Sequence, residues 1–369
     1  MNRHVPLLAA VATIVCLVAF GGSVGAHIVY ARPTLLSLVG SSDLVAHARI
    51  LDPHATLTVE TTGERRPIVR IELREVLKGD GDPGQELHFA SHGHGVAEYA
   101  AGEEVLVFLV PLARSKELAV LQTAGLHWVS LQEHDARYVL TPGVGERVLA
   151  AVRSYAATGR LTDPQARVEG LRGITLDLLT SGDARLGAAA VRDLVGAGDV
   201  ALVTAADVPR LLEEVVSSTN TAIAVRLGLL VELERRGLIA GASLWEELLH
   251  STSKPDLLQV VRAAGRHPSP QVAATLVEML GRDDEVAEAA ALALRNPAHH
   301  GAVPALEKTL QSDATRVRMS AIRALGRIGT PAARNALEIA AQNHEDVATR
   351  RRAAAEIRTL GPLPVPPAH

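Results

Sequence analysis

The chain has 369 residues, enough for two domains, and its hydrophobic content of 47% is ordinary for a globular protein. The formal net charge of -4 is too small to indicate an anionic partner or an electrostatic docking surface. Aromatic residues make up only 2%, and after residue 142 only Tyr155 and Trp245 follow. This change in composition predicts a boundary between two kinds of hydrophobic core.

The first 26 residues have the pattern of a secretory signal peptide. Arg3 precedes an apolar run over residues 5–20, and small residues lead to Ala26, after which we expect cleavage. The run is shorter than the ~20 residues that a membrane-spanning helix needs. We therefore expect an exported protein, either periplasmic or extracellular. The alternative is an uncut segment, residues 5–26, that anchors the chain in a membrane.

The only cysteine, Cys16, lies inside this N-terminal segment. A cleaved chain would have no disulfide, no thiol nucleophile and no thiolate metal site. Val15, directly before the cysteine, is too large for a lipoprotein-type cleavage site, so we do not expect lipid attachment. Export without disulfides is compatible with a bacterial periplasm, and it requires a fold that packing alone stabilises.

The segment that follows alternates apolar and polar side chains. The alternation is clearest at Leu44–Ile50, Val69–Leu73 and Leu87–Phe89, and a period of two is typical of half-buried strands. Val105–Val110 is apolar on both faces, which predicts a central strand. Further strands are expected near Leu118–Gln122, Leu126–Leu131 and Tyr138–Leu140. Such a set of strands predicts a small antiparallel barrel or sandwich.

Short motifs follow one another in this region: Ser42-Asp43-Leu44-Val45, then Val76-Leu77-Lys78-Gly79, then Tyr99, Gly102-Glu103, Leu106 and Phe108-Leu109. Their order resembles an N-terminal module of many exported bacterial proteins, similar to the netrin-like and metalloproteinase-inhibitor OB barrels. The resemblance covers about a third of the chain and implies an OB-type barrel. The cystines of the animal modules are missing here, so the resemblance implies no inhibitor activity.

Three histidines in the segment HFASHGHG are candidates for a metal site. His92 and His94 flank a glycine, and His88 points away from the core face of its strand. Imidazole nitrogens suit zinc, copper or nickel. Glu98 is the only nearby residue that would serve as a fourth ligand. The alternative is a solvated loop between two strands, and the sequence predicts no cofactor elsewhere.

The second half of the chain follows helical spacing, most clearly over Asp313–Ala341. Val317, Ala321 and Leu325 share one helical face. Gly329 ends that helix, and a proline starts the next. Shifts of 31, 61 and 35 residues lay Leu294, Ala264 and Leu360 on Leu325. A helix pair with one buried face must stack on copies of itself, so the shifts predict a solenoid. The alternative is a non-repetitive, Ala-rich helical bundle.

The run Asp313, Val317-Arg318, Ala321, Ala324-Leu325-Gly326 and Ile328-Gly329 resembles a short HEAT repeat of the phycocyanin-lyase-like type. The resemblance covers roughly Pro164 to Leu360. We therefore expect an α+β multidomain chain, in which a small antiparallel β-barrel or sandwich precedes an α-solenoid of HEAT-like helix pairs. The expected segments are a signal peptide at 1–26, an OB/netrin-like barrel at 27–142, a linker helix at 143–162, the solenoid at 163–361 and a disordered Pro-rich tail at 362–369.

The last repeats are rich in arginine, and four of these residues, Arg316, Arg323, Arg327 and Arg351, are candidates for binding a protein partner. An arginine-lined surface is able to hold a phosphate or an acidic peptide. The charge run itself favours a solvated helix face with local partners such as Glu345 and Asp346.

No P-loop or H-E-x-x-H motif occurs in the sequence, and Gly21, Gly22 and Gly25 belong to the expected signal peptide. The pattern favours a non-enzymatic exported protein that binds a protein partner through its solenoid. One alternative is a metal-binding protein or metal-dependent enzyme at the histidine loop. Another is a structural cell-envelope component held at the membrane by an uncut N-terminus. The export signal and the lack of interleaved aromatic residues disfavour nucleic acid as a partner.

Overall fold

The computed structural model describes residues 33–59, 63–91, 99–114, 122, 125–131, 138–198, 200–267 and 269–360. The expected signal peptide, His92, His94, most of the strand expected at residues 118–122 and the Pro-rich tail lie outside the described residues. Pro33 begins a compact unit that includes all the described residues. None of the described helices is both long enough and apolar enough to cross a membrane.

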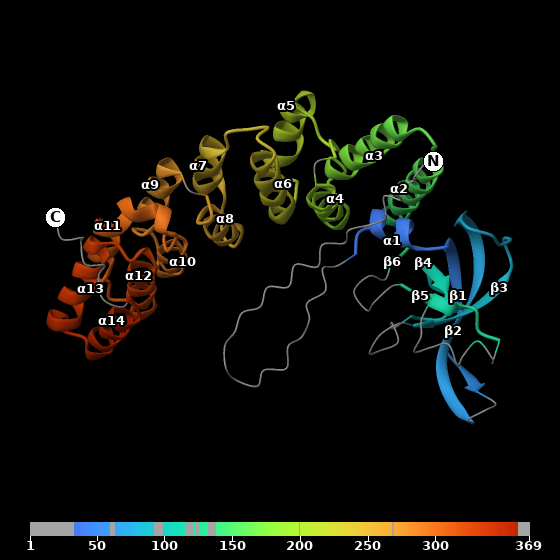
Figure 1. Cartoon of the computed structure of the whole chain (residues 1–369), viewed down its shortest axis with the longest axis horizontal. Helices are drawn as coiled ribbons and strands as arrows, with labels where there is room; N and C mark the ends of the chain where they lie inside the picture. The colour runs from blue at the N-terminus through green and yellow to red at the C-terminus, as the bar shows by residue number, and fades with distance from the viewer. Residues whose placement is uncertain are drawn as a thin grey trace, which may run out of the picture. The chain divides into compact units, whose positions relative to one another are not determined.

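The N-terminal part is a closed five-stranded barrel (Figure 1). Its strands are β1 (Leu44–Val59), β2 (Glu64–Lys78), β3 (Glu86–Ser91), β4 (Glu104–Pro111) and β5 (Trp128–Ser130). They pair in the order β1-β2-β3-β5-β4, and β4 pairs back onto β1. A short strand, β6 (Tyr138–Val139), adds to β4. The predicted barrel is thus confirmed.

One pairing in the barrel differs from the expected antiparallel pattern, because β3 and β5 run parallel. The reason is geometric. Antiparallel neighbours alternate in direction, so a closed ring with an odd number of strands must contain at least one parallel pair. The alternation of side chains gives no information on this, because it is the same in both kinds of pairing.

The alternation predicted for β1 and β2 does separate the two faces of the barrel wall. Leu44, Ala46, Ala48 and Ile50 on β1 are at most 1% exposed and face Ile71 and other core residues of the barrel. The rings of Phe89 and Tyr99 meet edge to face inside the barrel, with centroids 6.2 Å apart. The barrel therefore has a core of its own.

Strand β4 is apolar on both faces for a reason that the strand pattern does not show. Val105, Val107 and Leu109 belong to the barrel core. Leu106 and Phe108 belong instead to a second core, which contains residues of α1 (Leu35–Ser41) and α2 (Val144–Gly159). Helices therefore cover the outer face of β4, and the barrel and the helical part share buried surface.

Helix α2, expected as a linker, packs against α1, β2 and α3 (Pro164–Leu179). Val152 and Tyr155 of α2 are at most 2% exposed. Arg153 donates two hydrogen bonds to the carboxylate of Glu75 on β2, at 2.8 and 2.5 Å. Apolar packing and this bidentate ion pair thus connect the two parts of the chain.

The rest of the chain is a stack of helix pairs in two layers (Figure 1). One layer contains α4 (Ala184–Gly196), α6 (Ile223–Arg235), α8 (Asp256–Ala264), α10 (Asp284–Ala293), α12 (Thr315–Ile328) and α14 (Val347–Leu360). The other contains α5 (Val208–Leu211) with the π-turn η5 (Leu212–Val216), α7 (Ala242–Ser251), α9 (Pro270–Met279), α11 (Val303–Thr309) and α13 (Pro331–Asn343). Short 3-10 turns are η1 (Leu112–Arg114), η4 (Ala205–Asp207) and η6 (Pro297–Ala302).

Each helix of the even-numbered layer, from α4 to α14, contacts the next helix of that layer. Small side chains allow this close approach. Gly265 at the end of α8 lies so near α10 that a Cβ atom placed on it would be 2.6 Å from the Cα of Ala293. The predicted solenoid is confirmed. Its helices approach closely because their contact stripes are rich in small residues such as alanine.

The clearest predicted helix pair forms as its sequence indicates. Val317, Ala321 and Leu325 of α12 are buried. Gly329 ends α12 in the left-handed region, at φ 66°. The hydroxyl of Thr330 caps α13 by accepting from the backbone N–H of Ala333. Local signals thus determined both the ends and the buried faces of these helices.

Candidate functional site

The candidate metal site falls largely outside the described residues, which include His88 but neither His92 nor His94. His88 is exposed on β3, opposite Arg70 of β2. In the part of the chain that the structure describes, no three His, Cys, Asp or Glu side chains lie close enough to hold a metal ion. The histidine-loop hypothesis therefore stays a prediction.

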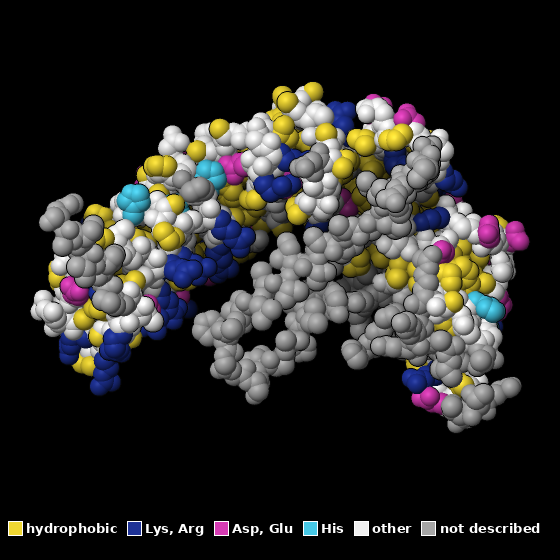
Figure 2. All heavy atoms as spheres, in the orientation of Figure 1, with side chains coloured by type: hydrophobic (Ala, Val, Ile, Leu, Met, Phe, Trp, Pro, Cys, Tyr) yellow, Lys and Arg dark blue, Asp and Glu magenta, His cyan; other side chains and the backbone are white. Residues whose placement is uncertain are grey.

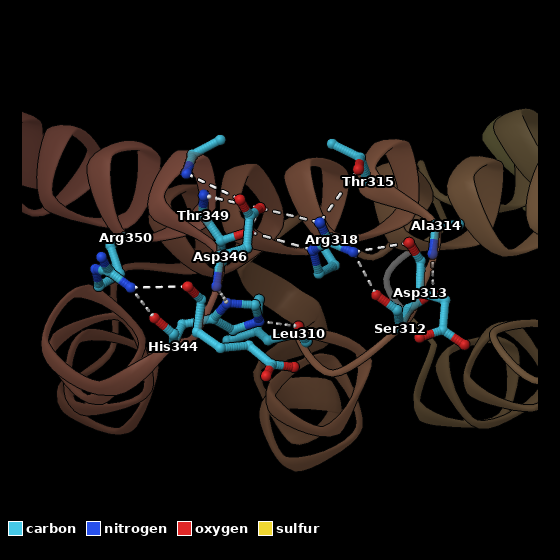
Figure 3. Close-up of polar contacts among 12 residues, drawn as sticks. Leu310, Ser312, Asp313, Ala314, Thr315, Arg318, His344, Asp346, Thr349 and Arg350 are labelled. Carbon is cyan, nitrogen blue, oxygen red and sulfur yellow. Dashed lines mark hydrogen bonds and ion pairs between the residues drawn. The ribbon is translucent and has the colours of Figure 1, made fainter.

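A polar network joins the last two repeats at the start of α12 and α14 (Figure 3). Arg318 donates through Nη1 to the carbonyls of Ser312 and Asp313, at 2.7 and 2.8 Å. Through Nη2 it donates to Oδ2 of Asp346, at 2.9 Å, in the next repeat. The hydroxyl of Thr349 donates to the same carboxylate oxygen, at 2.7 Å. We call this network the Arg318 clamp.

The next repeat copies part of the Arg318 clamp. Arg350 stands 32 residues after Arg318 and donates to the carbonyls of His344 and Glu345, at 2.5 and 2.9 Å. Hydrogen bonds from Thr349 and Arg318 hold the pKa of the Asp346 carboxyl well below its usual range. Arg318 therefore connects its loop to the next repeat through all three side-chain nitrogens, and Arg350 fastens its own loop through Nη1.

The four arginines predicted to bind a partner lie on another side of the same helices. Arg316, Arg323 and Arg327 follow one stripe of α12 at steps of seven and four residues, and Arg351 lies on α14. All four are exposed. Arg316, whose side chain is 77% exposed, has a carboxylate oxygen of Glu288 at 3.6 Å. Among the described residues, the other three have no hydrogen bond or ion pair.

The expected local partners of the basic run are used elsewhere. Asp346 accepts from Arg318, and the Glu345 carbonyl accepts from Arg350. Neither residue forms an ion pair with Arg323, Arg327 or Arg351 within the described segments. These three side chains are exposed to solvent, as the solvated-face interpretation expects. They differ from it in one respect, because no described carboxylate forms an ion pair with them.

Sequence reasoning missed further arginines on the same side of the even-numbered layer. Arg262 and Arg266 stand 61 residues before Arg323 and Arg327, and Arg358 stands 35 residues after Arg323. All three are exposed and, like Arg323, have no polar partner in the described part of the chain. The 61-residue shift already aligns Arg262 and Arg266 with Arg323 and Arg327, so reading the exposed positions in register would have found these two. Helix α14 follows α12 at a shift of 32 residues, which places Arg358 at the position of Gly326.

We call the six residues Arg262, Arg266, Arg323, Arg327, Arg351 and Arg358 the arginine face. Figure 2 shows Lys and Arg side chains gathered over α8–α14. The exposed stripe of α10 carries Glu285 and Glu288, and these interact with Lys254 and Arg316. The small net charge of the chain conceals this cluster, because the carboxylates that balance it lie mostly on other surfaces. The net charge of the whole chain therefore gives no information on a local cluster of this kind.

The even-numbered layer changes character along its length. On α4 and α6 its exposed positions include Val195 and Val231, which are 57% and 47% exposed. On α8, α12 and α14 exposed positions carry arginines, whereas α10 between them carries Glu285 and Glu288. The layer thus offers an apolar region followed by a cationic one. A large free side-chain surface of this kind suits recognition of another macromolecule.

Residues 281–358 match the pattern of the family described as HEAT repeats. The comparison with curated proteins finds no match. Among solved structures, an engineered protein is 22% identical with a TM-score of 0.33, and the match covers 55% of this chain and 94% of that chain.

Two further solved structures are similar to this chain at the same level. A designed armadillo repeat protein in complex with the peptide (KR)4 is 19% identical, with a TM-score of 0.34, over 55% of this chain and 97% of that chain. Human deoxyhypusine hydroxylase in complex with glycerol is 18% identical, with a TM-score of 0.30, over 62% of this chain and 91% of that chain.

Proposed function

We propose that this chain is a non-enzymatic, exported binding protein that holds a protein partner against the even-numbered layer of its solenoid. One observation carries the proposal. The exposed stripes of α8, α12 and α14 present the arginine face, whose side chains have no partner among the described residues. Solenoids of stacked repeats typically recognise partners along such a continuous surface.

The other polar clusters of the described chain are used for structure, which supports a binding role over a catalytic one. The Arg318 clamp connects repeats, and the pair of Arg153 and Glu75 connects the barrel to α2. Asp193 is buried, and the hydroxyl of Tyr155 donates to it at 3.3 Å. Arg318, His344 and Asp346 line one pocket, but hydrogen bonds to loop carbonyls and to each other already engage these side chains, so they are not arranged as a nucleophile, base and acid would be.

The proposal is tested by reversing charge on the arginine face. Tagged wild-type chain and a variant with Arg323→Glu, Arg327→Glu and Arg351→Glu would be crosslinked in envelope extract, and the captured proteins compared by mass spectrometry. The control variant carries Arg65→Glu, Arg160→Glu and Arg282→Glu, three exposed arginines away from the arginine face. We expect a partner that wild type and control capture and the face variant loses. Equal capture by all three would contradict the proposal.

The non-enzymatic part of the proposal is tested by elemental analysis of the purified chain. We expect no metal in stoichiometric amount. Zinc, copper or nickel bound one to one, and lost in His92→Ala, would favour the metal-dependent alternative instead.

Export is proposed from residues 1–26 alone. Fusing residues 1–30 to a reporter that is active only outside the cytoplasm tests this part of the proposal. We expect activity together with a processed N-terminus after Ala26. A processed reporter would support release, whereas an unprocessed reporter in the membrane fraction would support the anchored alternative.

A further inference from the structure

We infer that the partner contacts the arginine face with an extended acidic segment, in which Asp or Glu residues are interspersed with apolar ones. The inference rests on the proposed function and specifies its chemistry. Carboxylates are the protein groups that pair best with guanidinium groups, because two parallel N–H···O bonds fit one carboxylate.

The first argument is that the charge of the arginine face is not balanced within the described structure. Arg323 and Arg327, four residues apart on α12, have sequence equivalents in Arg262 on α8 and in Arg266, in the turn after α8. Like charges at this spacing repel each other on one helix face. The described neighbours supply no carboxylate to either pair. An acidic ligand would neutralise both pairs.

The second argument is the spacing of the arginines along each helix and between helices of the even-numbered layer. Arg323 and Arg327 are one helical turn apart, roughly 6 Å along the axis. Neighbouring helices of the even-numbered layer stand about 8–10 Å apart. An extended peptide advances about 3.3 Å per residue, so a segment laid across the helices meets a new row about every three residues. Acidic residues about three positions apart thus meet the arginines of α12 and α14, whereas those of α8 and α12 are two helix steps, or about six residues, apart because α10 carries no arginine.

The third argument is that apolar side chains, and no aromatic ones, lie among the arginines. Leu292 on α10 and Met319 on α12 are half-buried on the same exposed stripes, between arginine rows. The exposed stripes of α8–α14 contain no aromatic side chain on which a nucleic-acid base would stack. Apolar side chains between cations suit a peptide that carries both kinds of residue. These features favour a protein segment over a nucleic acid.

The inference is tested by fluorescence anisotropy with the full-length mature chain. The probe is a labelled peptide of repeated Glu-Leu-Asp, about 12 residues long, because at about 3.3 Å per residue it exceeds the roughly 30 Å that three helix-to-helix steps span. A peptide of repeated Gln-Leu-Asn serves as the uncharged match. We expect the acidic peptide to bind at least tenfold more tightly, and the difference to shrink as salt rises.

Matched protein variants locate the contact. Arg323→Gln with Arg327→Gln should weaken binding of the acidic peptide roughly tenfold, as expected for the loss of charge-assisted hydrogen bonds. Lys at both positions should restore only part of the affinity, because Lys lacks the bidentate fork. Arg65→Gln with Arg160→Gln, two exposed arginines on β2 and directly after α2, outside the even-numbered layer, should bind like wild type. Thermal unfolding of each variant shows that the fold is retained.

Several outcomes would overturn the inference. The inference fails if the protein binds both peptides with equal affinity, or if the control variant loses as much affinity as the arginine-face variant. It also fails if the protein binds only vesicles rich in phosphatidylglycerol, or only RNA. The proposed function fails separately. If the acidic peptide does not bind but charge reversal still abolishes crosslinked capture, the surface is correct and its ligand chemistry is wrong. If both experiments are insensitive to the arginine face, the proposed function also falls.

Discussion

Arg318 and Arg323 lie on the same helix, α12, five residues apart, and the structure uses them in opposite ways. Arg318 is 9% exposed and donates hydrogen bonds to two carbonyls, a carboxylate and two hydroxyls. Arg323 is exposed and has no polar partner in the described chain. The comparison shows that a basic run contains two populations. One population stabilises the stack of repeats, and the other remains available to a ligand.

The largest expected effect is on the Arg318 clamp. Arg318→Ala would leave the carbonyls of Ser312 and Asp313 without the guanidinium donor and would remove the ion pair of Asp346, whose carboxylate would still accept from Thr349. We expect unfolding to become easier by about 2–3 kcal/mol, since Arg318, whose side chain is 10% exposed, loses its charge-assisted hydrogen bonds to the loop and to the next repeat. Urea denaturation followed by circular dichroism measures the change. A loss below about 0.5 kcal/mol would mean that the clamp is incidental.

Two carboxyls extend the comparison, because the partly exposed Asp346 has Arg318 as a partner and the buried Asp193 has no ion pair in the described structure. Burial raises the pKa of Asp193 to about 6, although hydrogen bonds with Thr34 and Tyr155 oppose the rise. The folded state therefore binds this proton more tightly than the unfolded state. The resulting stabilisation, up to about 3 kcal/mol, is fully present below about pH 4 and is lost as pH rises through about 6.

The variant Asp193→Asn tests that expectation. The difference in unfolding free energy between wild type and variant should change between pH 4 and 6, with the variant gaining relative stability at the higher pH. Asp177→Asn, exposed on α3, serves as the matched control. Parallel pH profiles for wild type and Asp193→Asn would show that the buried carboxyl does not titrate in this range.

A third prediction concerns close packing within the even-numbered layer. Gly265→Ala would push a Cβ atom against the backbone of Ala293, so α8 and α10 must separate. We expect a loss of about 1–2 kcal/mol, measured by urea denaturation. Gly173→Ala in α3, where a Cβ would meet no atom within 4 Å, should instead stabilise the chain by up to about 1 kcal/mol. The opposite order would contradict the packing argument.

The smallest expected effect returns to the arginine face. Arg323→Ala should stabilise the chain slightly, by about 0.2–0.5 kcal/mol, because it removes repulsion from Arg327 one turn away. The gain should shrink at high salt. A clear loss of stability would place Arg323 in the same population as Arg318 and remove the distinction on which the comparison depends.

The sequence predicted the elements of the barrel better than their arrangement. Alternation located the core-facing residues of β1, including Ala46 and Ile50, because period two follows directly from strand geometry. It did not show the parallel pairing of β3 with β5, which comes from closing a ring of five strands. It also did not show why both faces of β4 are apolar, because the helices that cover Phe108 come from distant parts of the sequence.

The candidate surface was predicted in part. Arg316, Arg323, Arg327 and Arg351 were identified from composition, and their exposure follows from the helical period. Composition could not separate them from Arg318, because the carboxylate that engages Arg318 lies 28 residues away, in the loop before α14. It also missed Arg262 and Arg266, although the 61-residue shift found in the sequence aligns them with Arg323 and Arg327.

Local chemistry alone determined where helices and strands begin and end, which of their faces are buried, and that the second half repeats. These properties depend on steric preferences and hydrophobic periods over a few neighbouring residues. Only the tertiary structure decided how the barrel closes, which arginines are engaged and which remain free. Those outcomes depend on groups that meet across many residues of chain, and the position of such partners is set by packing.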